Sequence, residues 1–150
     1  EKWPHDKAPV AVSLSSLAYL WSLVGDRAEA RRAIDQTLLH LGDLGRPYPP
    51  LYKDSVHLSL GFSLLEAREP ERAVHHAEQA LEAVLELGRV PCHEHKIALY
   101  LAGEAALDAG HEESGWHYLS HLQRNYYCGW EDLRDLLLAV RTSGMVNWLA

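Results

Sequence analysis

The sequence predicts an all-α protein built from repeated helix pairs, and three observations indicate this fold class. Apolar residues recur at i, i+3, i+4 and i+7 in three separate segments, which is the period of an amphipathic helix. No stretch alternates apolar and polar residues for long enough to propose a strand. The three segments follow one another at intervals of 42–43 residues, and a fixed period in this range indicates a stack of repeated units.

The composition bounds the class of protein. The chain has 150 residues, of which 47% are hydrophobic and 23% charged, which is ordinary globular usage and excludes collagen and disorder. No apolar run approaches the roughly 18 residues of a membrane span, so we expect no membrane partner. The net charge of −7 argues against direct nucleic-acid contact, which needs a basic surface. Two cysteines are too few for a disulfide framework and favour a reducing, cytoplasmic location.

Proline and glycine mark the boundaries between the predicted units. Breaks occur at Gly45–Pro50, at Gly88–Pro91 and at Cys128-Gly129. They divide a single domain over residues 1–150 into units at about 9–50, 51–92 and 93–128, followed by a C-terminal helix at 130–150. This last helix would cap the stack or begin a further unit. The chain starts without Met, which suggests a piece of a longer protein.

Each unit shows the same three parts in the same order. The first helices carry the blocks Leu14-x2-Leu17-Ala18-x2-Trp21, His57-x2-Leu60-Gly61-x2-Leu64 and Leu99-x2-Ala102-Gly103-x2-Ala106. Short turns follow at Gly25-Asp26, Arg68-Glu69 and Gly110-His111. The second helices then begin with a small residue at Ala30, Ala73 or Gly115. Small residues at these places would let the paired helices approach closely.

These blocks resemble the tetratricopeptide repeat (TPR) family, whose pattern is W-x2-L-G-x2-Y, a small residue, and then A-x3-F. The period of 42–43 residues is longer than the usual 34, and the first block lacks its Trp in all three copies. Long-period copies of this kind resemble the regulatory regions of large bacterial transcriptional activators. The resemblance implies a right-handed α-α superhelix of three TPR-like pairs plus the C-terminal helix.

In this repeat class the first helices line a concave groove, and helical geometry identifies its candidate residues. Three aromatic residues would fall on equivalent or adjacent turns of neighbouring first helices: Tyr19, Phe62 and Tyr100. The other candidates are Leu65 and the acidic residues Glu66, Glu104 and Asp108. Such a surface would bind a protein or peptide segment that carries basic and apolar residues. Packing between units is an equally open interpretation of the same aromatic residues.

Histidine and cysteine clusters raise the question of a metal site. His117 and His121 are four residues apart on a predicted helix, but the sequence lacks the HExxH arrangement. Cys92-His93-Glu94-His95 is denser, yet we interpret it as a helix start with polar capping residues. We interpret His75-His76 as part of a solvated face. Arg27, Arg31 and Arg32 are interpreted in the same way, because Glu29 and Asp35 offset them.

The sequence therefore predicts recognition rather than catalysis. No nucleophile elbow, P-loop or dinucleotide fingerprint occurs, so we expect no enzyme, no cofactor and no metal ion. The favoured function is a protein-, peptide- or effector-binding module of a bacterial signalling or transcriptional regulator. The competing hypothesis is an interaction scaffold that drives oligomerisation or complex assembly without an effector, and an enzyme-associated metal module is a weaker third. A DNA- or nucleotide-binding region beside this segment would favour the regulator.

Overall fold

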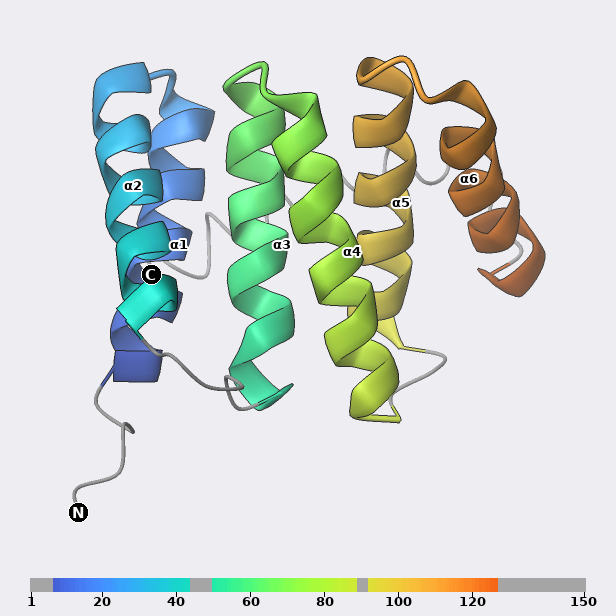
Figure 1. Ribbon diagram of the computed structural model, residues 1–150, viewed down its shortest axis with the longest axis horizontal. Coiled ribbons are helices and arrows are strands. Elements are labelled where there is room, and N and C mark those ends of the chain that lie inside the picture. The colour runs from blue at the N-terminus through green and yellow to red at the C-terminus, as the bar shows by residue number, and fades with distance from the viewer. Residues whose placement is uncertain (1–6, 44–49, 89–91, 127–150) are drawn as a thin grey trace.

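The computed structural model describes residues 7–43, 50–88 and 92–126, and every regular element in these ranges is an α-helix. The three helix pairs follow one another in chain order across the molecule (Figure 1). Their bounds are α1 Lys7–Val24, α2 Arg27–Asp43, α3 Pro50–Glu66, α4 Pro70–Glu86, α5 His93–Asp108 and α6 Glu112–Tyr126. The all-α prediction is therefore confirmed for the described residues.

The helices pack as sequential antiparallel pairs. Each first helix contacts the second helix of its own pair, α1 with α2, α3 with α4 and α5 with α6. Contacts between α1 and α3, between α3 and α5, and between α4 and α5 join one pair to the next. None of the described helices is long and apolar enough to cross a membrane. The handedness of a superhelix stays a prediction, and the predicted helix at 130–150 lies outside the described residues.

Local chemistry explains where several helices begin. Pro50 and Pro70 occupy the first positions of α3 and α4, where a missing N–H costs no hydrogen bond. The Asp26 carboxylate accepts the Glu29 N–H at 3.1 Å before α2. Cys92 caps α5, and its Sγ accepts a hydrogen bond from the His95 N–H at 3.3 Å. The interpretation of the Cys92–His95 segment as a capped helix start is therefore confirmed.

The three turns inside the pairs have the same backbone geometry. Gly25, Arg68 and Gly110 each adopt a left-handed conformation, with φ of 81°, 62° and 84°. In each turn the next residue donates its N–H to a carbonyl five positions back, at 3.0, 2.9 and 2.8 Å. This is the Schellman end of a helix, which needs one left-handed residue. Two units supply glycine there, whereas the middle unit places Arg68 in a conformation that its Cβ disfavours.

Small residues set the distance between the helices. An ideal Cβ added to Gly115 of α6 would lie 2.7 Å from Leu107 Cδ2 and 3.2 Å from the Gly103 carbonyl oxygen. A Cβ added to Gly61 of α3 would lie 2.5 Å from Leu101 Cδ2 of α5. Ala73 of α4 is fully buried, and its carbonyl oxygen is 3.5 Å from the same added Cβ. These positions therefore accept only small side chains.

Among the described residues the hydrophobic core forms two clusters. The first lies mainly between α1, α2 and α3 and also includes Ala73 of α4 and Ala105 of α5; its other buried members include Ala18, Ile34, Leu60 and Leu64. The second combines α3 and α4 with α5 and α6, and its buried members include Phe62, Ala77, Leu99, Leu101 and Leu119. The middle pair contributes to both clusters, so the pairs cannot separate without exposing apolar surface.

The burial of Ala73 generates a test of the helix-pair register. Ala73→Leu would insert three carbon atoms into the close α3–α4 contact, and overpacking of this kind costs about 1–3 kcal/mol. We expect a clear fall in the free energy of unfolding, measured by urea denaturation followed by circular dichroism. Gln36→Leu, which adds the same side chain at an exposed position of α2, should leave stability nearly unchanged. Equal effects of the two changes would contradict this register.

The conformation of Arg68 generates a second test. Arg68→Gly should raise the free energy of unfolding by about 1 kcal/mol, because a left-handed residue with a Cβ costs roughly 1–2 kcal/mol relative to glycine. Gly110→Ala should lower it by a similar amount, since nothing within 4 Å would obstruct the new methyl group and only the backbone conformation is strained. Thermal and urea melts of both variants measure the effect. Destabilisation by Arg68→Gly would mean that the contacts of the arginine side chain stabilise the fold by more than the left-handed backbone costs.

Candidate functional site

The seven predicted groove residues all lie on the row of first helices. Their elements are α1 for Tyr19, α3 for Phe62, Leu65 and Glu66, and α5 for Tyr100, Glu104 and Asp108. Since α1 contacts α3 and α3 contacts α5, these helices are neighbours in the order that the repeat predicts. Whether their surface is concave and binds a partner stays a prediction.

The aromatic residues converge on one cluster between the pairs. The Tyr19 and Phe62 rings lie with their centroids 5.7 Å apart and their planes tilted by 40°. Phe62 is only 7% exposed and belongs to the core, while Tyr19, Leu65 and Tyr100 are half-buried and pack against it. Phe62 therefore serves mainly to hold units together, and Tyr19 and Tyr100 are the aromatic residues that keep part of their surface in solvent.

The acidic residues lie at the C-terminal ends of two first helices, α3 and α5. Glu66 is the last residue of α3 and Asp108 the last of α5, and both are exposed. Glu104 stands one turn before Asp108 and is half-buried. The C-terminal end of a helix carries a partial negative charge of its own, so carboxylates placed there add to a negative potential. Glu104 and Asp108 at the end of α5 therefore favour cationic groups, whereas Glu66 shares its surroundings with Arg27 and Arg68.

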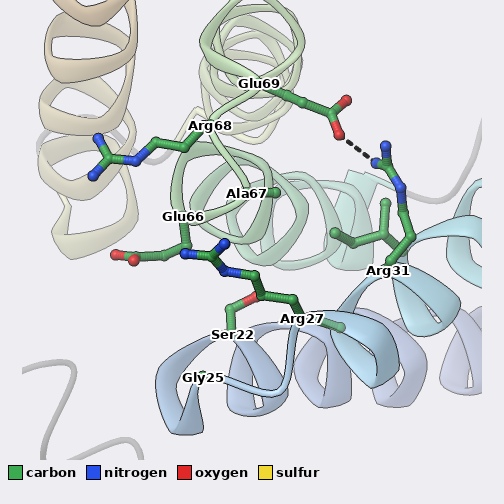
Figure 2. A pocket seen from close by; sticks show the side chains of 10 residues that line it. Ser22, Gly25, Arg27, Arg31, Glu66, Ala67, Arg68 and Glu69 are labelled. Carbon is green, nitrogen blue, oxygen red and sulfur yellow. Dashed lines mark ion pairs between the residues drawn. The ribbon is translucent and has the colours of Figure 1, made fainter.

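A pocket of about 350 Å³ adjoins Glu66, between the turn of the first pair and the turn of the second. Arginine side chains and small apolar residues line it together with two carboxylates (Figure 2). The lining residues are Ser22, Gly25, Arg27, Ala30, Arg31, Ile34, Glu66, Ala67, Arg68 and Glu69. In Figure 2 Arg31 points toward Glu69, whereas Arg68 extends away from them. A pocket of this size with both charge signs could hold one polar side chain or a small zwitterion.

Glu69 connects the first two pairs at the rim of this pocket. Its carboxylate forms an ion pair with Arg31 of α2 and another with Arg72 of α4. Partial burial alone would raise the pKa of Glu69, but hydrogen bonds from Arg72 and Arg31 outweigh it and hold that pKa below its usual value. The interpretation of Arg31 as part of a merely solvated face was therefore incomplete. Residue spacing could not reveal a partner that lies in the next unit.

The middle pair buries two histidines against each other. The Nδ1 atoms of His57 in α3 and His76 in α4 are 2.8 Å apart, a hydrogen bond in which one ring must donate and the other accept. The two residues are 9% and 6% exposed. Burial, followed by the proximity of other basic groups, lowers the pKa of His57 to about 3 and that of His76 to about 4. The interpretation of His75-His76 as a solvated face is wrong for His76, although His75 is exposed.

A smaller polar network joins the start of α5 to the end of α6. The Tyr126 hydroxyl lies 2.6 Å from His95 Nδ1 and donates a hydrogen bond to the Cys92 carbonyl at 3.3 Å. Burial, followed by the neighbouring His121, lowers the pKa of His95. This network joins α5 to α6. The Cys92 thiol remains the cap of α5, and its pKa is raised because burial disfavours the thiolate.

The histidines do not assemble a metal site within the part of the chain that the structure describes. Across residues 7–43, 50–88 and 92–126, no group of three or more His, Cys, Asp or Glu side chains is placed to hold a metal ion. His117 is exposed on α6, and the rings of His121 and His95 meet edge-on, at a centroid distance of 5.9 Å and an interplanar angle of 79°. The expectation of a protein without metal or catalytic activity stays a prediction.

The buried histidine pair makes stability depend on pH. Histidines in the unfolded chain bind protons near pH 6.5, whereas His57 and His76 do so only near pH 3 and 4 in the folded protein. The unfolded state therefore binds more protons below pH 6.5, and the free energy of unfolding should fall as pH drops from 6.5 toward 4. The slope should reach about 1.4 kcal/mol per pH unit for each histidine.

The contribution of the pair can be isolated by difference. The double variant His57→Gln/His76→Gln should show a shallower fall between pH 6.5 and 4.5 than the natural chain. His93→Gln, an exposed position, serves as the matched control and should leave the slope unchanged. Denaturant titrations at each pH measure the slopes. An identical slope in the natural chain and the double variant would contradict the burial of neutral imidazoles.

No protein-family model, no curated protein and no solved structure matches this chain.

Proposed function

We propose that this chain is a TPR-like recognition module of a bacterial signalling or transcriptional regulator, and that it binds a protein or peptide segment in the cytoplasm. The repeated helix pair supports the assignment to a long-period TPR-like class. All three turns share one set of backbone hydrogen bonds, and the small residues that follow the second and third turns, Ala73 and Gly115, lie in close helix contacts. Repeat proteins of stacked helix pairs present extended surfaces, which suits the recognition of a chain segment.

One observation supports the location of the binding surface on the first helices. The half-buried Tyr19 and Tyr100 pack on a single cluster that runs across the units, and the acidic ends of α3 and α5 lie beside it. Aromatic rings offer a large contact area at a low cost in conformational entropy, because they are already held by their neighbours. Tyr19 and Tyr100 are therefore the aromatic anchors of the proposed surface, and Leu65 between them adds apolar area.

The charges determine the chemistry of the partner. Glu66, Glu104 and Asp108 would attract a segment with Lys or Arg next to apolar residues. Because the acidic residues are exposed or half-buried, they should contribute more to the association rate than to the lifetime of the complex. The apolar contacts should determine the lifetime.

A displayed library of random dodecapeptides tests this proposal on the purified chain. We expect selection to enrich peptides that carry Lys or Arg within a few positions of Leu, Ile, Phe or Trp. Tyr100→Ala should weaken the best peptide by at least ten-fold, since truncation of a hot-spot anchor costs about 2 kcal/mol or more. Glu104→Gln/Asp108→Asn should mainly slow association, and added salt should mask that change.

Matched controls separate binding from folding. Tyr52→Ala removes an exposed tyrosine from α3 outside the proposed surface and should leave peptide affinity unchanged. Glu86→Gln removes an exposed carboxylate at the end of α4 and should leave the association rate unchanged. Circular dichroism verifies that every variant folds. Selected peptides that bind the Tyr100→Ala variant as tightly as the natural chain would place recognition on another surface.

A further inference from the structure

The pocket between the first two helix pairs combines a basic rim with an apolar floor. Its volume is about 350 Å³, which lies within the usual range of small-molecule sites. Ala30 and Ile34 of α2 line its floor and are only 5% and 0% exposed. Arg27, Arg31 and Arg68 line its rim, and all three are exposed. This composition suits a ligand that joins an anionic group to a short apolar body.

The side chains around the pocket carry an excess of positive charge. Glu69 is already neutralised, because Arg31 and an arginine of α4 both form ion pairs with its carboxylate. Neither Arg27 nor Arg68 forms an ion pair with another residue that the structure describes. The other carboxylate of the lining is Glu66, so these two arginines face a single glutamate. The pocket is therefore a basic site on a chain whose net charge is −7.

Arg27 is the residue best placed to hold an anionic group. It is the first residue of α2, and Figure 2 shows its side chain pointing from α2 toward the end of α3. Its planar guanidinium matches the two oxygens of a carboxylate. Arg31 lies one helical turn further along and keeps N–H donors that its ion pair with Glu69 does not use. Helix ends of opposite dipole sign, the start of α2 and the end of α3, adjoin the pocket, so the side chains determine the sign of its potential.

The basic rim belongs to the first junction of the stack and is not part of the repeat. The residues 43 positions after Arg27 and Arg31 are uncharged, namely Pro70 and Val74. The packing differs as well, because α5 packs closely on α4, whereas α3 packs on α1 and touches α2 only slightly. The pocket lies where α2 stands apart from the turn between α3 and α4. Its arginines therefore serve no contact that the repeat pattern requires.

We propose that this pocket binds a small aliphatic carboxylate. The carboxylate pairs with Arg27 and Arg31, and the aliphatic body rests on Ala30 and Ile34. A ligand bound in this way connects α2 to the turn before α4, where the packing of the first pair on the second is sparse. It therefore favours one arrangement of the two pairs, which is the action of an effector. The proposal does not rest on peptide binding by the first helices, with whose proposed surface the pocket shares only Glu66.

A titration of the nitrogen-labelled chain with isovalerate, followed by two-dimensional NMR, tests the proposal. Isovalerate joins one carboxylate to a branched aliphatic body. We expect saturable shifts, in the millimolar range, of the Gly25 amide and of other amides that line the pocket. Isovaleramide has the same shape without the charge and should bind at least about ten-fold more weakly, because a charge-assisted pair with arginine is much stronger than a neutral hydrogen bond.

Three variants separate the roles of charge and space. Arg27→Gln should weaken isovalerate binding by at least about five-fold, since it removes a charged donor of the rim. Arg32→Gln is the matched control, because it removes the same charge from the same helix at an exposed position that does not line the pocket. It should bind like the natural chain. Ala67→Leu fills part of the pocket, keeps every arginine and should also weaken binding. Circular dichroism verifies that each variant folds.

Four results would overturn the proposal. The first is the absence of saturable shifts at the pocket amides. The second is equal binding of isovalerate and isovaleramide, or of isovalerate to the natural chain and the Arg27→Gln variant. The third is equally tight binding of inorganic phosphate, which would indicate a general anion site without recognition of the apolar body. The fourth is tighter binding of acetyl-Gly-Gly-Val with a free carboxylate, which would assign the pocket to the C-terminus of a peptide. Loss of peptide binding by the first helices would leave these outcomes unchanged.

Discussion

The close approach of helices at small residues is the constraint on which the rest of the structure depends. The backbone of Gly103 lies where a methyl group on Gly115 would nearly touch it, and Leu101 occupies the space that a side chain on Gly61 would need. Such contacts fix the separation of the helices, because a larger residue would force them apart. The separation in turn determines which faces of α1, α3 and α5 remain at the surface.

The middle pair is the part of the stack in which packing and polar chemistry compete. It contributes to both core clusters, yet it buries His57 on His76 where the other first helices place Leu14 and Leu99. The pair is tolerated because one imidazole donates and the other accepts, so neither buried nitrogen of that contact lacks a partner. The same unit carries the strained Arg68 in its turn. Its stability is therefore more sensitive to pH and to turn chemistry than a purely apolar repeat would be.

Two surfaces of the molecule differ in charge and therefore in the kind of partner that they could bind. The row of first helices ends in carboxylates at the negative ends of α3 and α5, so long-range attraction toward cations is available there. The second surface is the exposed apolar side of α1, which carries no charge and offers only apolar contact through Val10, Leu17, Trp21 and Val24. Electrostatic attraction can steer a partner toward the first surface, and added salt weakens that attraction. A partner of the second surface must match its shape and is bound by the burial of apolar area.

Much of the fold follows from local sequence. The spacing of Leu14, Leu17, Ala18 and Trp21 and its two copies places three first helices, and the left-handed turn residues end them, because periodicity and turn chemistry act within a few positions of the chain. What the tertiary structure alone decided concerns contacts across units. It buried Phe62 and His76, joined Arg31 to Glu69 and left Leu17 and Trp21 in solvent while their equivalents Leu60 and Leu64 are buried. Equivalent residues share a helix face, but whether that face is covered depends on a helix from another pair, which a single repeat does not encode.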